Sequence, residues 1–135
     1  MTERDAGTQA QELNQISGEI IGAAIDVHSE LGPGLLESVY EECLAYELML
    51  RNILFERQKP IPVMYKGKPI DCGFRLDLLV SDSIVVELKT VDQILPVHQA
   101  QLMTYLKLTG CKLGLILNFN VEKMMKGIKR MVNHL

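Results

Sequence analysis

The sequence predicts an α+β fold in which a mixed central β-sheet is flanked by helices. Through the first fifty residues, apolar side chains recur at three- and four-residue steps, as they do on one face of a helix. The period then changes to the alternation and short apolar runs typical of strands. One more helical segment and one more buried strand follow, so the expected order is α-α-β-β-β-β-α-β.

Length and composition indicate one soluble globular domain. The 135 residues fit a single domain over 1–135, of which we expect residues 1 to about 8 to be disordered. Apolar residues make up 47% and charged residues 23%, which is ordinary for a soluble chain. No apolar run approaches the roughly 18 residues that a membrane span needs, so no membrane partner is expected. The polar N-terminus is unlike a signal peptide, and three separated cysteines argue against a disulfide framework or structural zinc, so we expect a reducing cytoplasm.

Charge is distributed unevenly along the chain. Residues 1–50 hold ten acids and one base, whereas residues 51–135 hold seven acids and thirteen bases. The halves therefore carry −9 and +6 and must pack against each other with opposite fields. A basic face of this kind permits a phosphate ligand, although solvated surface explains the charges equally simply.

Two helices are expected first. The helical pattern from Gln9 to Leu31 ends at Gly32-Pro33-Gly34, because glycine is a usual residue after a helix and proline cannot continue one. A second helix is expected from about Leu36 to Arg51.

The strands follow. We expect strands at Leu54–Gln58, Ile61–Tyr65, Ile70–Val80 and Ile84–Thr90, with turns at residues 66–68 and 81–83. Pro96 suits the first turn of a helix that runs to Thr109 and is closed by Gly110. Residues 112–118 read as a buried strand, and residues 121–132 are ambiguous between helix and strand.

The hairpin around Ser81-Asp82-Ser83 brings two acids together. With a three-residue loop, Val80 lies opposite Ile84, and Asp77 lies opposite Glu87. One face of this ribbon is then wholly apolar and belongs to the core: Leu76, Leu78, Val80, Ile84, Val86 and Leu88. The register is an assumption, because a two-residue loop would put Asp77 and Glu87 on opposite faces.

A hard cation would resolve the repulsion between these acids. Like charges opposite each other destabilise a sheet, and carboxylates about 5 Å apart tend to keep one proton. Mg²⁺ or Mn²⁺ accepts oxygen ligands and offsets both charges. Lys89 shares this face and can neutralise charge on an attacked phosphate. The alternative is a solvated face with diagonal salt bridges, from Asp77 to Lys89 and from Arg75 to Glu87, although both strands are too apolar to be edge strands.

These residues resemble the PD-(D/E)XK nuclease superfamily. Asp77 followed by Glu87-Leu88-Lys89 is similar to the superfamily's D…(D/E)xK arrangement, with Leu76 where the classical proline would stand. Gln101 and Tyr105 resemble the QxxxY element of its exonuclease-like branch. Gly34-Leu35-Leu36-Glu37-Ser38-Val39-Tyr40 resembles the motif of the GxxExxY protein family, and the resemblance covers about residues 15–133.

The resemblance implies a metal site and a set of roles. Asp77, Glu87 and the carbonyl of Leu88 would hold Mg²⁺ or Mn²⁺, with Glu37 as a further ligand through water. Glu37 is otherwise simply an acid that suits the start of a helix. Lys89, Gln101 and Tyr105 would complete the catalytic set. The remaining candidates have weaker signals: His28 and Arg75 as accessory residues, Tyr40, for which a core position is the simpler reading, and Lys66, Lys68 and Lys107 as phosphate contacts.

The sequence therefore predicts a metal-dependent nuclease that hydrolyses phosphodiester bonds of DNA or RNA. The alternatives are a non-catalytic nucleic-acid-binding module on the same fold, and a protein-interaction module that docks through its acidic helices. Homo-oligomer formation stays open.

Overall fold

The computed structural model describes residues 3–135 and confirms the α+β class. Two helices precede five strands, and a third helix and two further strands complete the chain. Two residues at the N-terminus lie outside the described part. Within residues 3–135, every helix is too short or insufficiently apolar to cross a membrane.

The N-terminal helices α1 (Glu3–Leu31) and α2 (Glu37–Leu50) lie where the periodicity predicts them. Helix α1 begins at Glu3, six residues before the predicted start at Gln9. Alanine, glutamine and glutamate favour helix. At the other end, Gly32 adopts a φ of +67° and its N–H donates to the carbonyl of His28 over 2.8 Å. The chain then turns back into α2.

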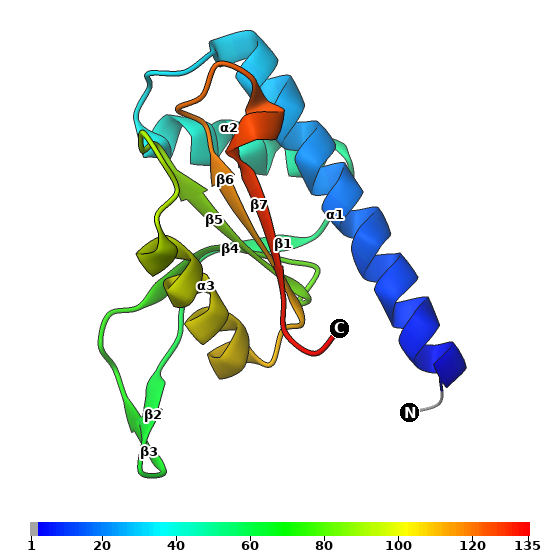
Figure 1. The fold of residues 1–135 in the computed structure, drawn as a ribbon, viewed down its shortest axis with the longest axis vertical. Helices are drawn as coiled ribbons and strands as arrows, with labels where there is room; N and C mark the ends of the chain where they lie inside the picture. The colour runs from blue at the N-terminus through cyan, green and yellow to red at the C-terminus, as the bar shows by residue number, and fades with distance from the viewer. Residues whose placement is uncertain (1–2) are drawn as a thin grey trace.

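Five strands form the central sheet in the order β1-β4-β5-β6-β7. Their bounds are Phe55–Pro60, Arg75–Val80, Ile84–Lys89, Leu113–Asn118 and Ile128–Val132. Strands β5 and β6 are parallel and are joined by α3 (Pro96–Thr109), whereas the other pairs are antiparallel. Helices α1 and α2 cover one face of the sheet and α3 covers the other (Figure 1). As predicted, β4 and β5 are interior strands.

Two stretches differ from the predicted strands. Residues 70–80 were expected to form one strand, but β3 (Lys68–Ile70) pairs with β2 (Val63–Tyr65) in a separate hairpin, and β4 begins only at Arg75. The break falls at Gly73, which has a φ of +73° and donates its N–H to Asp71 Oδ1. The ambiguous stretch becomes a short 3₁₀ helix, Met124–Gly127, followed by edge strand β7.

Apolar side chains form a core on each face of the sheet. The core beneath α1 and α2 includes Ile20, Val27, Tyr40, Leu44, Leu78, Val80, Ile84, Val86 and Leu88. The core beneath α3 includes Leu76, Leu79, Val85, Leu102, Tyr105, Leu106 and Ile116. Leu76 thus lies on the face opposite to the predicted one. Strict alternation along β4 stops at Asp77, the position where the strand loses its regular pairing.

Ion pairs join the acidic and the basic half of the chain, as their opposite charges predict. The Arg51 guanidinium lies 2.7 Å from Asp26 and 3.2 Å from Glu19 on α1. From β1, Arg57 lies 2.8 Å from Glu41 on α2. These contacts tie both N-terminal helices to the start of the sheet.

Gly127 provides a test of this packing. A Cβ atom built there would lie 2.0 Å from the carbonyl oxygen of Asn118, which is backbone and cannot rotate away. We expect Gly127→Ala to lower the free energy of unfolding by about 3 kcal/mol or more, measured by chemical denaturation. Gly18→Ala is the matched control, because α1 has open space there and alanine favours helix by about 0.5–1 kcal/mol. Equal stability of the two variants would contradict this packing.

Candidate active site

The site lies where the β4–β5 hairpin opens. The predicted register is confirmed for the three pairs next to the turn, from Val80 opposite Ile84 to Leu78 opposite Val86. A φ near +50° at Ser81 and Asp82 forms the three-residue turn. The next positions are Asp77 and Glu87, and there the regular ladder between the strands stops.

Where the regular backbone pairing stops, the side chains of Asp77 and Glu87 link the two strands by hydrogen bonds. Asp77 Oδ2 accepts the backbone N–H of Leu88 over 2.8 Å, and Glu87 Oε1 accepts the backbone N–H of Asp77 over 3.3 Å. Each acid therefore binds the other strand's backbone. This arrangement confirms that Asp77 and Glu87 come together, as the sequence predicted, although through side chains and not as a regular cross-strand pair.

Glu87 is a buried acid whose ionised form is strongly disfavoured. Only 6% of the residue is exposed. Burial, followed by the negative charge of Asp77, raises the pKa of Glu87 to about 9, while the backbone N–H of Asp77 and the charge of Lys89 act in the opposite direction. Glu87 therefore holds a proton at neutral pH, and its ionised form next to Asp77 would need more positive charge than Lys89 supplies.

Glu37 and Lys89 lie within electrostatic range of this pair. Partial desolvation, then the charge of Asp77, raises the pKa of Glu37, and Lys89 opposes this effect. Lys89 ends β5 and acts on both Glu37 and Glu87. Among the ion pairs of residues 3–135, neither predicted diagonal salt bridge is present. The solvated-face alternative is therefore not what the chain adopts.

Two residues that the sequence analysis missed support Asp77. The Gln58 amide donates to Glu41 Oε1 over 2.6 Å and to Asp77 Oδ1 over 3.5 Å. Gln58 has a φ of +50°, a conformation that costs a non-glycine residue on the order of 1 kcal/mol or more. Glu41 is buried and also accepts two hydrogen bonds from Arg57. No local pattern marks these residues, because they meet Asp77 only through the β1–β4 pairing and the packing of α2.

Tyr105 and Gln101 come from α3. Tyr105 is buried, and its pKa is raised by burial and then by the charges of Glu87 and Asp77, so its hydroxyl lies within electrostatic range of the two acids. Its ring also meets Phe74 edge to face at 6.1 Å between centroids. Gln101 lies one turn earlier on the same side of the helix and is exposed.

His28 and Tyr40 hold the fold. His28 Nε2 binds the Val121 carbonyl at 2.7 Å. The Tyr40 hydroxyl bonds to the Gly32 carbonyl and accepts the N–H of Leu35, and its ring stacks on Phe119 at 4.5 Å. Tyr40 thus takes the core position that the sequence favoured and anchors the loop between α1 and α2, whereas His28 ties α1 to the segment after β6.

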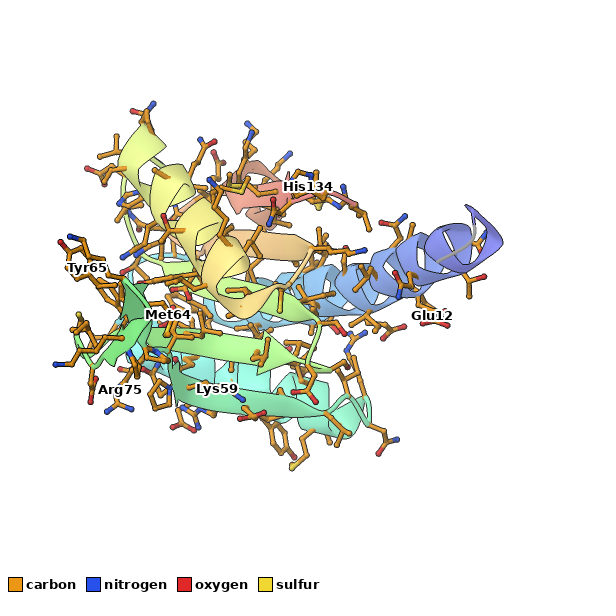
Figure 2. All side chains as sticks on the ribbon, turned by 90° about the horizontal axis from the view of Figure 1, so that it is seen from below. Glu12, Lys59, Met64, Tyr65, Arg75 and His134 are labelled. Atoms are coloured by element: carbon orange, nitrogen blue, oxygen red, sulfur yellow. The ribbon has the colours of Figure 1, made fainter. Side chains whose placement is uncertain are left out.

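The basic candidates are divided between two ends of the molecule. Arg75 begins β4 and donates to the Gln58 carbonyl, and Lys66 and Lys68 lie on the β2–β3 hairpin next to it (Figure 2). Lys107 lies in the last turn of α3. It is therefore near the turn end of the sheet, away from Lys89.

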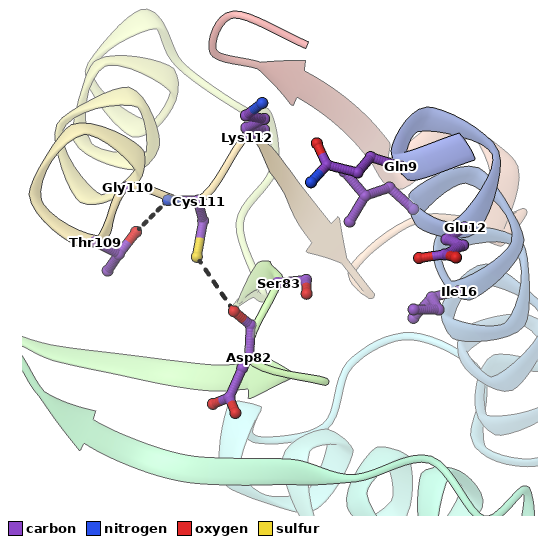
Figure 3. A pocket seen from close by; sticks show the side chains of 10 residues that line it. Gln9, Glu12, Ile16, Asp82, Ser83, Thr109, Gly110, Cys111 and Lys112 are labelled. Atoms are coloured by element: carbon purple, nitrogen blue, oxygen red, sulfur yellow. Dashed lines mark hydrogen bonds between the residues drawn. The ribbon is translucent and has the colours of Figure 1, made fainter. Parts of the chain in front are cut away.

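That turn end holds a pocket of about 290 Å³ between α1, the 81–83 turn and the end of α3. Glu12, Asp82, Cys111 and Lys112 contribute to its wall (Figure 3). A strand's length separates it from Lys89, so it does not belong to the site of the paired acids.

The donor set fits a divalent metal ion. Two carboxylates in contact, one of them buried, form an oxygen-rich site with unbalanced negative charge, which Mg²⁺ or Mn²⁺ would offset. Within residues 3–135, no three His, Cys, Asp or Glu side chains are gathered closely enough to form a complete metal-binding set.

The mixed sheet carries Asp77, Glu87 and Lys89 in the D…ExK arrangement of a nuclease-type fold. The sequence model of the PD-(D/E)XK nuclease superfamily matches residues 14–131, and the chain belongs to that superfamily. Membership in the narrower GxxExxY family stays a prediction. Comparison with curated proteins and with solved structures gives no match.

The raised pKa of Glu87 predicts how stability depends on pH. The folded state keeps a proton that the unfolded state releases near pH 4.5, so this contribution to stability is lost as pH rises towards 9. Between pH 5 and 8 this contribution should fall by roughly 4 kcal/mol at most, which would lower the melting temperature by on the order of 10 °C. Glu87→Gln should flatten this dependence and melt higher at pH 8, whereas Glu42→Gln, an exposed acid, should not. An unchanged pH profile in Glu87→Gln would contradict the assignment.

Proposed function

We propose that the protein is a nuclease that hydrolyses phosphodiester bonds with the help of Mg²⁺ or Mn²⁺. The observation that supports this most is that Asp77 and Glu87 each accept a backbone N–H of the opposite strand where the regular β4–β5 pairing ends. Lys89 lies next to them. A bound divalent ion would supply counter-charge for the phosphate and activate the attacking water.

The ligands we propose are the carboxylates of Asp77 and Glu87 and the carbonyl of Leu88, with Glu37 in the outer shell. The N–H and C=O of one strand residue point to the same side. Since the N–H of Leu88 points to Asp77, its carbonyl does so too, at a position where the β4–β5 ladder has ended. Three oxygen donors therefore converge from two adjacent strands.

Lys89 is the residue we propose to stabilise negative charge on the phosphate. Its ammonium group already acts on Glu37 and Glu87, so it lies beside the proposed metal ligands. The hydroxyl of Tyr105 faces the same acids from α3 and orients Lys89 or the substrate, and Gln101 adds a polar group at the exposed rim.

Gln58 and Glu41 are positioning residues in this proposal. Gln58 holds the Asp77 oxygen that does not bind Leu88, and Glu41 fixes the Gln58 amide. Because metal ions require well-placed ligands, this second layer should affect metal affinity more than folding.

The nuclease proposal is tested by cleavage of DNA and RNA in Mg²⁺, Mn²⁺ or EDTA. Asp77→Asn keeps an oxygen for the Leu88 N–H but loses a charge, and Lys89→Ala removes the ammonium group. We expect each to reduce cutting at least about 100-fold, since such groups contribute several kcal/mol to the transition state. Lys112→Ala, at the other end of the sheet, should cut normally. Equal cutting by all variants would indicate a contaminant. Nucleic-acid binding without metal-dependent cutting by wild type would favour the non-catalytic alternative.

Gln58→Ala gives a separate prediction. The Mg²⁺ concentration for half-maximal cutting should rise by about tenfold or more, because second-layer residues typically affect metal affinity by that amount. Glu42→Gln is the control, as Glu42 bonds to Arg57 on the exposed side of the same cluster. A lowered melting temperature with an unchanged metal requirement would show that Gln58 serves folding only.

A further inference from the structure

The β2–β3 hairpin stands away from the rest of the molecule. Its strands pair only with each other, apart from the five-stranded sheet. In Figure 1 it extends beyond the end of α3, and in Figure 2 its residues Met64 and Tyr65 lie at the side where Arg75 is found. A two-stranded hairpin is marginally stable by itself, so an extended one suggests a binding function.

The hairpin exposes two large apolar side chains, and their exposure to water is unfavourable unless a partner covers them. Met64 is 55% exposed and Tyr65 is 63% exposed. Lys66 Nζ lies over the Tyr65 ring, 5.6 Å from its centroid, so the apolar and cationic groups form one surface. Aromatic rings combined with cations are typical of surfaces that bind nucleic acid.

The charge of this segment has one sign. The segment 57–70 contains four bases and no acid, but Arg57 and Lys59 on β1 are in ion pairs with Glu41, Glu42 and Glu56. The charge of the hairpin itself therefore comes from Lys66 and Lys68, whereas residues 1–50 contain ten acids. A polyanion is therefore attracted to the hairpin and repelled by α1 and α2.

We propose that the hairpin enters the major groove of duplex DNA and positions the duplex for the site at Asp77. The inference rests on the proposed function and names its substrate class. Two strands about 4.8 Å apart with their side chains match a groove about 12 Å wide and exceed one about 6 Å wide. The deep, narrow major groove of an RNA duplex does not admit such a ribbon.

The path of the chain links the β2–β3 hairpin directly to the acids of the site. The hairpin leaves the sheet after Pro60 and returns at Arg75, two residues before Asp77. Arg75 is exposed at this junction and donates to the Gln58 carbonyl, so its guanidinium lies between hairpin and site. A duplex held by Lys66 and Lys68 thus presents its backbone towards Arg75 and Lys89.

The test measures binding without cutting. Full-length protein carrying Asp77→Asn is titrated in EDTA against a labelled 30-base-pair DNA duplex, the matching single strand and an RNA duplex of equal length. Adding Lys66→Ala and Lys68→Ala should weaken binding to duplex DNA at least tenfold and reduce the salt dependence by about two ions. The control, Lys112→Ala with Lys129→Ala, removes the same charge next to β6 and on β7, away from the hairpin, and should change affinity less than threefold. Dimethyl sulfate should methylate guanine N7, a major-groove atom, less in the wild-type hairpin complex than in the hairpin variant.

Each result supports or contradicts the proposal that the hairpin binds the major groove of duplex DNA. Equal weakening by both pairs of substitutions, tighter binding to the single strand or RNA duplex, or unprotected guanine N7 would overturn the inference. If the wild-type protein cuts nucleic acid while giving these binding results, the nuclease proposal stands and only the role of the hairpin is rejected. Hairpin-dependent duplex binding without any cutting by wild type would support the inference and reject the nuclease proposal. Circular dichroism of every variant checks that the fold is intact.

Discussion

The structure depends on the break in the hydrogen-bond ladder at Asp77. On the turn side of that point β4 and β5 are paired and buried on both faces. Beyond it, the strands are held by the Asp77 carboxylate on the Leu88 N–H and the Glu87 carboxylate on the Asp77 N–H. Carboxyl oxygens thereby take the place of backbone carbonyls inside a sheet. This substitution brings two acids close together without separating the strands.

Such an arrangement is costly unless something compensates the charge. Desolvation of Glu87 beside Asp77 disfavours ionisation, and Lys89 offsets only part of that effect. The rest of the fold maintains the arrangement: Glu41 and Gln58 support Asp77 from α2 and β1, and α3 closes the opposite face. A rigid scaffold around an electrostatically unfavourable pair is what a preorganised metal site requires.

Acidic and basic side chains also lie on different parts of the molecule. Part of the negative charge of α1 and α2 is paired within the molecule, with Arg51 and Arg57. In the second half, Lys66 and Lys68 lie on the hairpin and Arg75 lies at its junction with the sheet, whereas Lys107 and Lys112 lie near the turn end. One chain of modest net charge, −3, can therefore attract a polyanion at one place and repel it elsewhere.

The sequence by itself determined the helices, the three-residue turn and hence the meeting of Asp77 and Glu87, because periodicity, turn residues and register are local properties. Only the tertiary structure decided that Leu76 changes face, that residues 68–70 leave the sheet, and that Gln58 and Glu41 reach Asp77. These features arise from contacts between segments far apart in the chain. A local pattern cannot encode them, since the same residues would read as an ordinary strand or helix face without their distant partners.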